Sequence, residues 1–353
     1  MVFSAAGAGG VSLYRQRLEA ETFQPAGSPE RLTSGSDTAW LPSVAAGRLA
    51  FFSTRADSNL WSVALDAASG TAHGPLRRMT RGPFPLGFLT VTNDFRTLAY
   101  LSYRLGGDIF LRDLSTGSER PLADGPPEPK GYPAISPSGR LLAYGARMPG
   151  GGRALRPIFV ASLPDQTWRT LGDDCGGRPR EWVDERRLVI ERFARLNSIA
   201  IIDTETGDQR ELLQSADRSI SNPRLSPDRR WIAFDASRPS EPASVCVAPF
   251  REPLIPESEW AVVDRSASHP FWSADGRLLY YTPMGTNPFF RSAVRGRHFA
   301  AASGLVDSEP IAAYASTEML MPAYLPGTAA IATPDQIILV LGDYRGDVWM
   351  MEV

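Results

Sequence analysis

One turn-and-strand motif recurs along almost the whole sequence and limits the folds available to it. The segment ISPSGRLLAYGA at 135–146 returns as LSPDRRWIAFDA at 225–236 and as WSADGRLLYYTP at 272–283. The motif returns about every 45 residues, and near-copies at a fixed period mark a fold built from repeated supersecondary units. A β-sandwich also has many strands, but it does not need a constant period. The chain is therefore predicted to be a repeat protein.

Each repeat contains a tight turn followed by short strands. In SPSG and SPDR the proline presets φ for a type I turn, and serine and aspartate can bond the local backbone. The apolar run that follows, such as RLLAYG at 140–145, fits a strand that neighbouring sheets bury on both faces. A third strand ends in a polar turn, as in IFLRDLSTG at 109–117, and a fourth short strand completes the unit, as in RRMT at 77–80. Four short strands per period are the size of one propeller blade.

Eight such units can be counted, and we predict that residues 1–353 form a single all-β domain, a β-propeller of four-stranded blades. The first unit lacks its innermost strand, since residues 13–33 align without a gap to residues 60–80 and MVFS before them matches a second strand. We therefore expect Met1 to be either a misassigned start or the boundary of a longer chain. Two closures remain open. The units form eight blades, or seven blades close by pairing 29–33 with 347–353 and leave 1–28 as an extra layer.

Charge and hydropathy argue against several classes of function. The net charge of −2 gives no general attraction to nucleic acid or to an anionic membrane surface. The aliphatic run IILVL at 337–341 is far shorter than the roughly 20 residues needed to span a bilayer. No signal peptide is visible at the amino terminus, so the sequence as written predicts a cytoplasmic protein, or a periplasmic or extracellular one if the N-terminus is truncated.

The repeat, of the type S-P-D-G-R-x-L-A-Y, resembles that of the TolB-like, WD-like bacterial propellers over practically the whole chain. Relatives in that family include the periplasmic TolB component of the Tol system, oligogalacturonate lyases and the gating propellers of prolyl-oligopeptidase-type serine peptidases. Similar repeats form sensor or scaffold halves of bacterial kinases and regulators. The resemblance implies a propeller fold, and it is much less specific for function because one fold serves many activities.

The sequence lacks the motifs that the enzymatic relatives would need. A peptidase needs a G-x-S-x-G elbow, which does not occur. The lyase resemblance implies a metal held mainly by histidines, but only His269 lies where a channel-facing residue is expected, whereas His73 and His298 lie in predicted loops. Cys175 and Cys246 form no CxxC pair. We therefore predict no cofactor and no metal.

Candidate binding residues gather at one end of the predicted channel, where the innermost strands begin. The first position of each strand is rich in aromatic and hydrogen-bonding side chains, as the rim of a ligand or peptide site would be. The same aromatics could instead wedge between tapering blades. Glu181 and Arg224 lie on adjacent blades and are positioned to form an ion pair. The predicted partner-binding residues are Trp40, Phe88, Tyr132, Glu181, Asn222, Arg224, His269 and Phe271.

These observations predict a non-catalytic propeller that binds a protein or peptide partner, or a small ligand, as a scaffold or sensor module that could belong to a larger bacterial protein. The alternative is a channel-centred lyase or hydrolase of the oligogalacturonate-lyase-like type that uses Glu181, Arg224 and His269. No nucleic-acid partner and no membrane span are expected.

Overall fold

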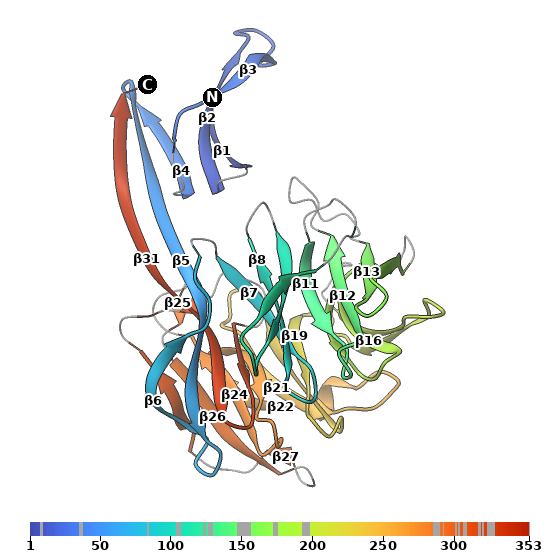
Figure 1. Cartoon of the computed structure of the whole chain (residues 1–353). Helices are drawn as coiled ribbons and strands as arrows, with labels where there is room; N and C mark the ends of the chain where they lie inside the picture. The colour runs from blue at the N-terminus through green and yellow to red at the C-terminus, as the bar shows by residue number, and fades with distance from the viewer. Residues whose placement is uncertain are drawn as a thin grey trace.

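The computed structural model shows a ring of β-sheets from which a smaller group of strands rises at one end (Figure 1). No helix in the described part of the chain is long and apolar enough to cross a membrane. A 3₁₀ turn, η2, covers Glu257–Glu259. The structure describes residues 1–7, 10–34, 38–82, 85–103, 107–122, 125, 130–146, 157–171, 176–192, 198–284, 290–291, 293–300, 302, 304–305, 309–316, 319, 321–322 and 329–352.

Five antiparallel sheets follow one another along the chain, and each begins with an inner strand. Apolar residues form a continuous run in the second strand of each sheet, because neighbouring sheets cover both of its faces. The first and second sheets are β7 (Leu86–Val91), β8 (Thr97–Ser102), β9 (Asp108–Asp113), β10 (Glu119–Pro121), and β11 (Lys130–Ile135), β12 (Leu141–Ala146), β13 (Ile158–Ser162), β14 (Thr167–Thr170). The third and fourth are β15 (Arg178–Trp182), β16 (Arg187–Arg192), β17 (Ser198–Asp203), β18 (Gln209–Leu213), and β19 (Ser219–Leu225), β20 (Trp231–Ser237), β21 (Ser244–Pro249), β22 (Ala261–Arg265). The fifth is β23 (Ala267–Trp272), β24 (Leu278–Pro283), β26 (Ala293–Ala300), β27 (Gly304–Leu305) and β28 (Ile311–Ala315).

The sixth sheet joins the two ends of the chain and closes the ring. Its inner strand is β30 (Ala330–Ala332), followed by the first half of β31 (Gln336–Glu352), the second half of β5 (Arg48–Asp66) and β6 (Thr71–Arg78). The inner strands β7, β11, β15, β19, β23 and β30 contact one another in a closed cycle. Closure matters because it removes free sheet edges from the ring.

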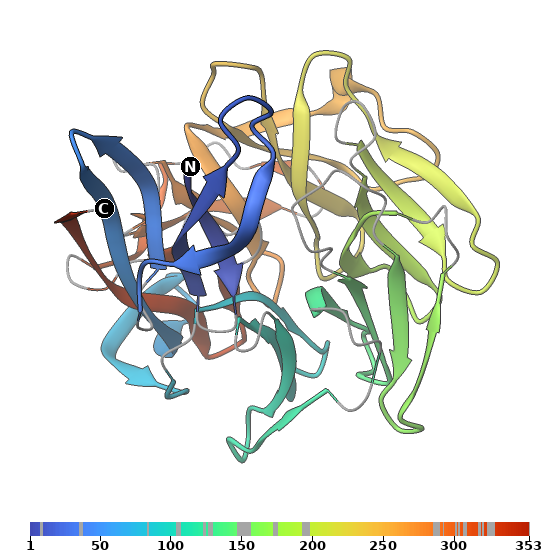
Figure 2. The same cartoon turned by 90° about the horizontal axis from the view of Figure 1, so that it is seen from above.

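The strands β5 and β31 continue past the ring and form an extension. Beyond the ring β5 also pairs with β4 (Thr38–Ala45). A separate sheet of β1 (Val2–Gly7), β2 (Gly10–Leu18) and β3 (Pro25–Arg31) packs against this sheet, mainly on β4. Leu13, Ala39 and Leu49 form the small core between the two sheets. We call residues 1–53 and 346–352 the extension. It rises from the end of the ring at which the inner strands begin, which we call the mouth (Figures 1 and 2).

The all-β propeller of four-stranded sheets is confirmed, but the described strands place six sheets around the ring rather than eight or seven. The reason is that β5 and β31 are each one continuous strand where the repeat predicted a hairpin of two strands. β5 and β31 pair continuously from Gln336↔Ala64 to Glu352↔Arg48. The third strand of one repeat therefore completes a sheet with the second strand of another, and the remaining strands enter the extension. The predicted pairing of 29–33 with 347–353 does not form, because β3 pairs with β2.

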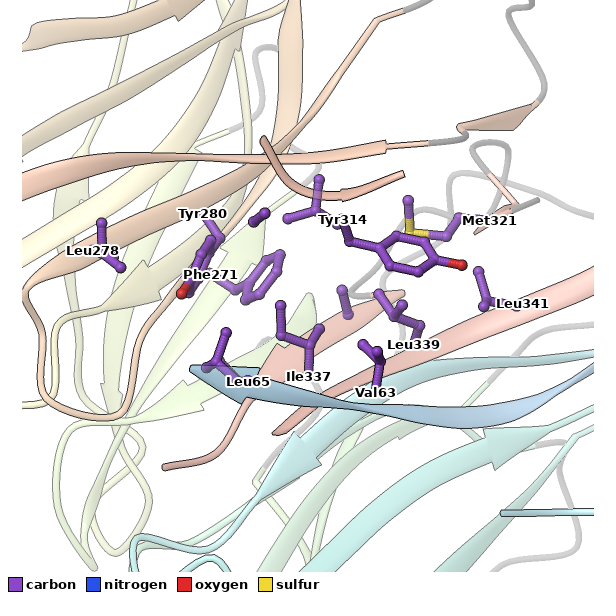
Figure 3. Close-up of a cluster of buried hydrophobic side chains, with 14 residues drawn as sticks. Val63, Leu65, Phe271, Leu278, Tyr280, Tyr314, Met321, Ile337, Leu339 and Leu341 are labelled. Carbon is purple, nitrogen blue, oxygen red and sulfur yellow. The ribbon is translucent and has the colours of Figure 1, made fainter. Parts of the chain in front are cut away.

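The apolar core lies between neighbouring sheets. Figure 3 shows the cluster between the fifth and sixth sheets, where Leu278 and Tyr280 approach Leu65 and Ile337. The Tyr280 hydroxyl donates to the carbonyl of Gly70 at 3.1 Å. Gly70 has φ of 70°, and a Cβ atom there would lie 2.2 Å from Leu278 Cδ1, so the turn after β5 requires glycine. Two short strands, β25 (Phe290–Arg291) and β29 (Met321–Pro322), pair beside this cluster.

Candidate functional site

Left-handed bulges interrupt the inner strands near the mouth. In all five consecutive sheets, the pairing between the first and second strands contains a register shift. In four of them a residue of the bulge is left-handed, with φ of 56° at Phe88, 56° at Tyr132, 53° at Asn222 and 58° at His269. Residues other than glycine adopt this conformation rarely, and it recurs beside functional sites, where bulges re-aim side chains. Four of the predicted site residues therefore share one special backbone position.

One buried carboxylate secures two of these bulges. Asp235 Oδ1 and Oδ2 accept the backbone N–H of His269 at 3.0 and 3.2 Å, and Oδ2 also accepts Nδ2 of Asn222 at 2.8 Å. Burial raises the pKa of Asp235 to about 7, although the bonds from Asn222 and His269 act in the opposite direction. Both the ionised and the protonated carboxyl are therefore populated near neutral pH. The imidazole Nδ1 of His269 lies 2.9 Å from the hydroxyl of Ser268.

A second buried carboxylate joins two arginines. Glu191, which is 1% exposed, accepts a hydrogen bond from Arg180 Nη2 and lies 3.4 Å from Arg178 Nη1. It also accepts the backbone N–H of Asn222 at 3.4 Å. The guanidinium carbon of Arg178 lies 4.7 Å from the centre of the Tyr132 ring. Because buried charges are costly unless they are paired, these contacts tie the second, third and fourth sheets to one polar network.

Glu181 pairs with Arg229 and not with its predicted partner Arg224. Its Oε1 lies 2.7 Å from Arg229 Nη1, and its Oε2 accepts the backbone N–H of Leu225 at 2.9 Å. Burial lowers the pKa of the Arg224 guanidinium to about 10. The nearby charge of Glu181 raises this pKa, and that of Arg180 lowers it further. Arg224 is therefore still charged at neutral pH. The structure brings Glu181, Asn222, Arg224 and His269 to one region.

The predicted aromatic residues lie elsewhere or are buried. Phe88 and Tyr132 are 6% and 7% exposed, and their rings meet edge to face at 4.8 Å. Phe271 is also buried and stacks on Tyr280 at 5.2 Å. Trp40 lies on β4, in the extension and not on the ring. The ring aromatics thus pack between sheets, as the wedge alternative expected, while polar side chains occupy the mouth.

Sequence reasoning missed four residues of the network. Arg178, Arg180, Glu191 and Asp235 complete it, and they lie outside the positions of the inner strands that the prediction considered. A signal was present, since Glu191 ends the apolar run RLVIE and Asp235 follows WIAF in strands that are otherwise buried. A charged side chain inside such a run is unusual unless it is paired.

Metal ligands and reactive thiols do not gather in the network. Within the described ranges, no three His, Cys, Asp or Glu side chains converge as a metal-binding group. His73 on β6 and His298 on β26 are exposed. Cys246 is buried, and burial raises the pKa of its thiol to about 11. Cys175 lies outside the described residues.

Comparison with solved structures decides the type of ring. A protein assigned as TolB from Agrobacterium tumefaciens is 16% identical, with 82% of this chain and 99% of that chain covered and a TM-score of 0.61. TolB from Acinetobacter baumannii is also 16% identical, with 98% of this chain and 81% of that chain covered and a TM-score of 0.53. The chain has the fold of a TolB-type β-propeller. Searches with family models and against curated proteins found no match to the sequence of this TolB-type propeller.

Proposed function

We propose that this TolB-type propeller is a non-catalytic binding module that holds a protein or peptide partner at its mouth. The observation that carries the proposal is the pair of left-handed bulges at Asn222 and His269, fixed by the buried carboxylate of Asp235. Asn222 and His269 are themselves half-buried and reach the mouth in a fixed conformation. Groups held in place before binding lose less conformational entropy when a partner arrives, and this favours affinity.

The position of the extension also favours the mouth as the binding surface. β5 leaves the ring at Ser58, whose hydroxyl accepts the backbone N–H of Leu86 at 3.0 Å, where the inner strand β7 begins. On the extension, Val348, Trp349 and Met350 are 78%, 56% and 64% exposed. Apolar side chains grouped on a surface commonly mark interaction sites. A macromolecular partner at the mouth would therefore meet polar groups on the ring and apolar groups beside it.

The enzymatic alternative has less support in the geometry. A channel-centred lyase or hydrolase would need a carboxylate or imidazole within reach of a substrate proton. Both oxygens of Glu181 accept hydrogen bonds from Arg229 and Leu225, and both oxygens of Asp235 accept the N–H of His269. These carboxylates are engaged in holding the ring together. A small ligand at the mouth is compatible with the same contacts.

A capture experiment with matched variants tests the proposal. The full chain, His269→Asn and Trp168→Ala are immobilised and exposed to the same bacterial lysate. His269→Asn removes the imidazole, and asparagine tolerates the left-handed backbone at this position. Trp168, which is 47% exposed on the outer strand β14, serves as a surface control. We expect a protein retained by the wild type and by Trp168→Ala to be lost from His269→Asn. Equal retention by all three, or no specific retention, would contradict the proposal.

A further inference from the structure

The extension contains a sheet whose third strand has no fourth strand beside it. In each ring sheet the third strand pairs with a short outer strand, as β9 does with β10 and β17 with β18. In the extension, β4 and the first half of β5 take the first two places, and the last residues of β31 take the third. From residue 342 to residue 352, no strand in the described part of the chain pairs with the other edge of β31. This edge lies on the outer side of the extension, away from β4 (Figure 1).

The outer edge of β31 presents backbone groups that can form a β-ladder. Within the ring, the N–H of Val340 donates to the carbonyl of Ala329 on β30 at 2.7 Å, so Val340 directs its backbone groups away from β5. The register between β31 and β5 has no shift from residue 336 to residue 352. Every second residue therefore directs its N–H and C=O to the same side as Val340, and in the extension these residues include Val348 and Met350. Their backbone groups point to the edge at which the structure describes no neighbouring strand.

The side chains along this edge are exposed and apolar. Val348 and Met350 lie on one face of the sheet, and Trp349 lies on the other face beside Phe51 of β5. Proteins that stay monomeric commonly protect such an edge with lysine or proline. The segment GDVWMME at 346–352 contains neither residue. The edge is therefore open to pairing with another strand.

A second copy of the same edge is complementary to it. Two identical antiparallel strands pair about a two-fold axis, so each residue faces a residue of the same segment. In the register centred on Trp349, Val348 lies opposite Met350 of the second copy, and the two Trp349 side chains lie opposite each other. Glu352 then lies opposite Gly346, whereas a register centred on Met350 would place Glu352 opposite Val348. Because apolar and aromatic cross-strand pairs stabilise a sheet, the register centred on Trp349 is favoured.

We propose that β31 of two copies pair edge to edge, antiparallel and centred on Trp349, so that the sheets of the two extensions become one continuous sheet. Val348 and Met350 of the second copy then exchange both N–H···O bonds, and the two Trp349 residues form the closer, non-hydrogen-bonded pair. The row formed by Phe51 and Trp349 continues across the two-fold axis into the second copy. This interface goes beyond the proposed function, because the bulges at the mouth take no part in it.

Disulfide cross-linking of the full chain tests the register. The Cα atoms of a non-hydrogen-bonded pair are about 4.5 Å apart, within the range that a disulfide spans. We therefore expect Trp349→Cys to form a covalent dimer under mild oxidation, seen on a non-reducing gel. Asp347→Cys is the matched control on the same face, and it should form far less dimer because the two copies of this position lie about 13 Å apart along the strands. The wild-type chain sets the background from Cys175 and Cys246.

A proline variant tests the backbone bonds of the same interface. Met350→Pro removes an N–H that points away from β5, and proline is tolerated on an edge strand in that orientation. Each dimer loses two N–H···O bonds, so sedimentation equilibrium should show a dimer dissociation constant at least about tenfold above that of the wild type. Met350→Ala, which keeps the N–H, should raise the constant less, and thermal unfolding should show that both variants are folded.

Three results would overturn the proposed pairing. They are a wild type that stays monomeric at the highest concentration reached, equal effects of Met350→Pro and Met350→Ala, and equal cross-linking, or none, of Trp349→Cys and Asp347→Cys. None of these results bears on the capture of a partner at the mouth, which the variant His269→Asn tests separately.

Discussion

The carboxylate of Asp235 on β20 accepts the backbone N–H of His269 on β23 at 3.0 Å, so a buried acid of one sheet holds the left-handed bulge of the next. A bulge leaves a backbone N–H without its usual partner in the ladder, and a buried N–H must find another acceptor. Asp235 supplies that acceptor and, through Asn222, reaches its own inner strand as well. The mouth is thus shaped by side chains that cross from sheet to sheet.

Replacing Asp235 with asparagine is expected to change how stability depends on pH. The pKa of Asp235 is raised from 3.8 to about 7 in the folded state. The protonated carboxyl therefore favours folding, and its contribution is full below about pH 4 and is lost as the pH rises through 7. Relative to Asp235→Asn, the wild type should lose up to about 1.4 kcal/mol of unfolding free energy per pH unit in this window. Urea unfolding at pH 5 and pH 8 measures the difference, and parallel pH profiles would refute it.

Removing the charge of Glu191 should cost far more than removing that of an exposed acid. Glu191→Gln leaves Arg180 buried with a neutral partner, and loss of one member of a buried pair typically costs about 3–5 kcal/mol. Glu259 pairs with Arg251 at the surface, where water screens the charges, and Glu259→Gln should therefore cost much less than Glu191→Gln. Denaturant unfolding of both variants checks this. Similar losses would mean that Glu191 is not the centre of the network.

The turns at the opposite end of the ring are expected to serve stability. Ser138 donates its backbone N–H and its hydroxyl to Glu185 of the next sheet at 2.8 and 2.9 Å. Ser138→Ala removes the hydroxyl bond and should lower the unfolding free energy by about 1 kcal/mol. Binding of any partner captured by the wild type should be unchanged. If Ser138→Ala kept its full stability but lost that partner, the binding surface would lie at the turns and not at the mouth.

The edge strand of the extension, β31, is expected to mediate self-association of the protein. Val348 and Met350 lie on one face of β31, opposite Phe52 and Ala50 of β5, and β31 is the edge of this three-stranded sheet. Exposed apolar edges favour contacts between chains, and a lysine on the edge opposes them. Sedimentation velocity should show self-association of the wild type at high concentration that Val348→Lys reduces. Identical profiles for both proteins would contradict this expectation.

The repeat unit was predictable from the sequence because its causes are local. Turn residues, apolar runs and the period lie within about 45 residues of one another. The number of sheets was not, because it depends on the pairing of β5 with β31 from opposite ends of the chain. Nothing in either segment distinguishes an open hairpin from a closed one. The sequence indicated eight repeats, but the described strands form a ring of six sheets.

The candidate site was predictable only in part, for reasons of register. Asn222, Arg224 and His269 were found because the repeat aligns their strands. Trp40 was misplaced in the alignment, since the left-handed residue of β4 is Leu41, with φ of 50°, and β4 belongs to the extension. The polar partners on second strands, such as Asp235, become visible only when the sheets are packed. Which side chains meet across two blades is a property of the closed ring.

Hydrogen–deuterium exchange of the full chain, with and without its captured partner, tests most directly whether the mouth is the binding surface. Bound amides lose contact with solvent or open less often, so they exchange more slowly. We expect added protection in 178–182, 219–225 and 267–272, where the bulges of β15, β19 and β23 lie, and no change in the turns at 136–140, 226–230 and 273–277. Protection confined to those turns, with the bulge segments unchanged, would contradict it.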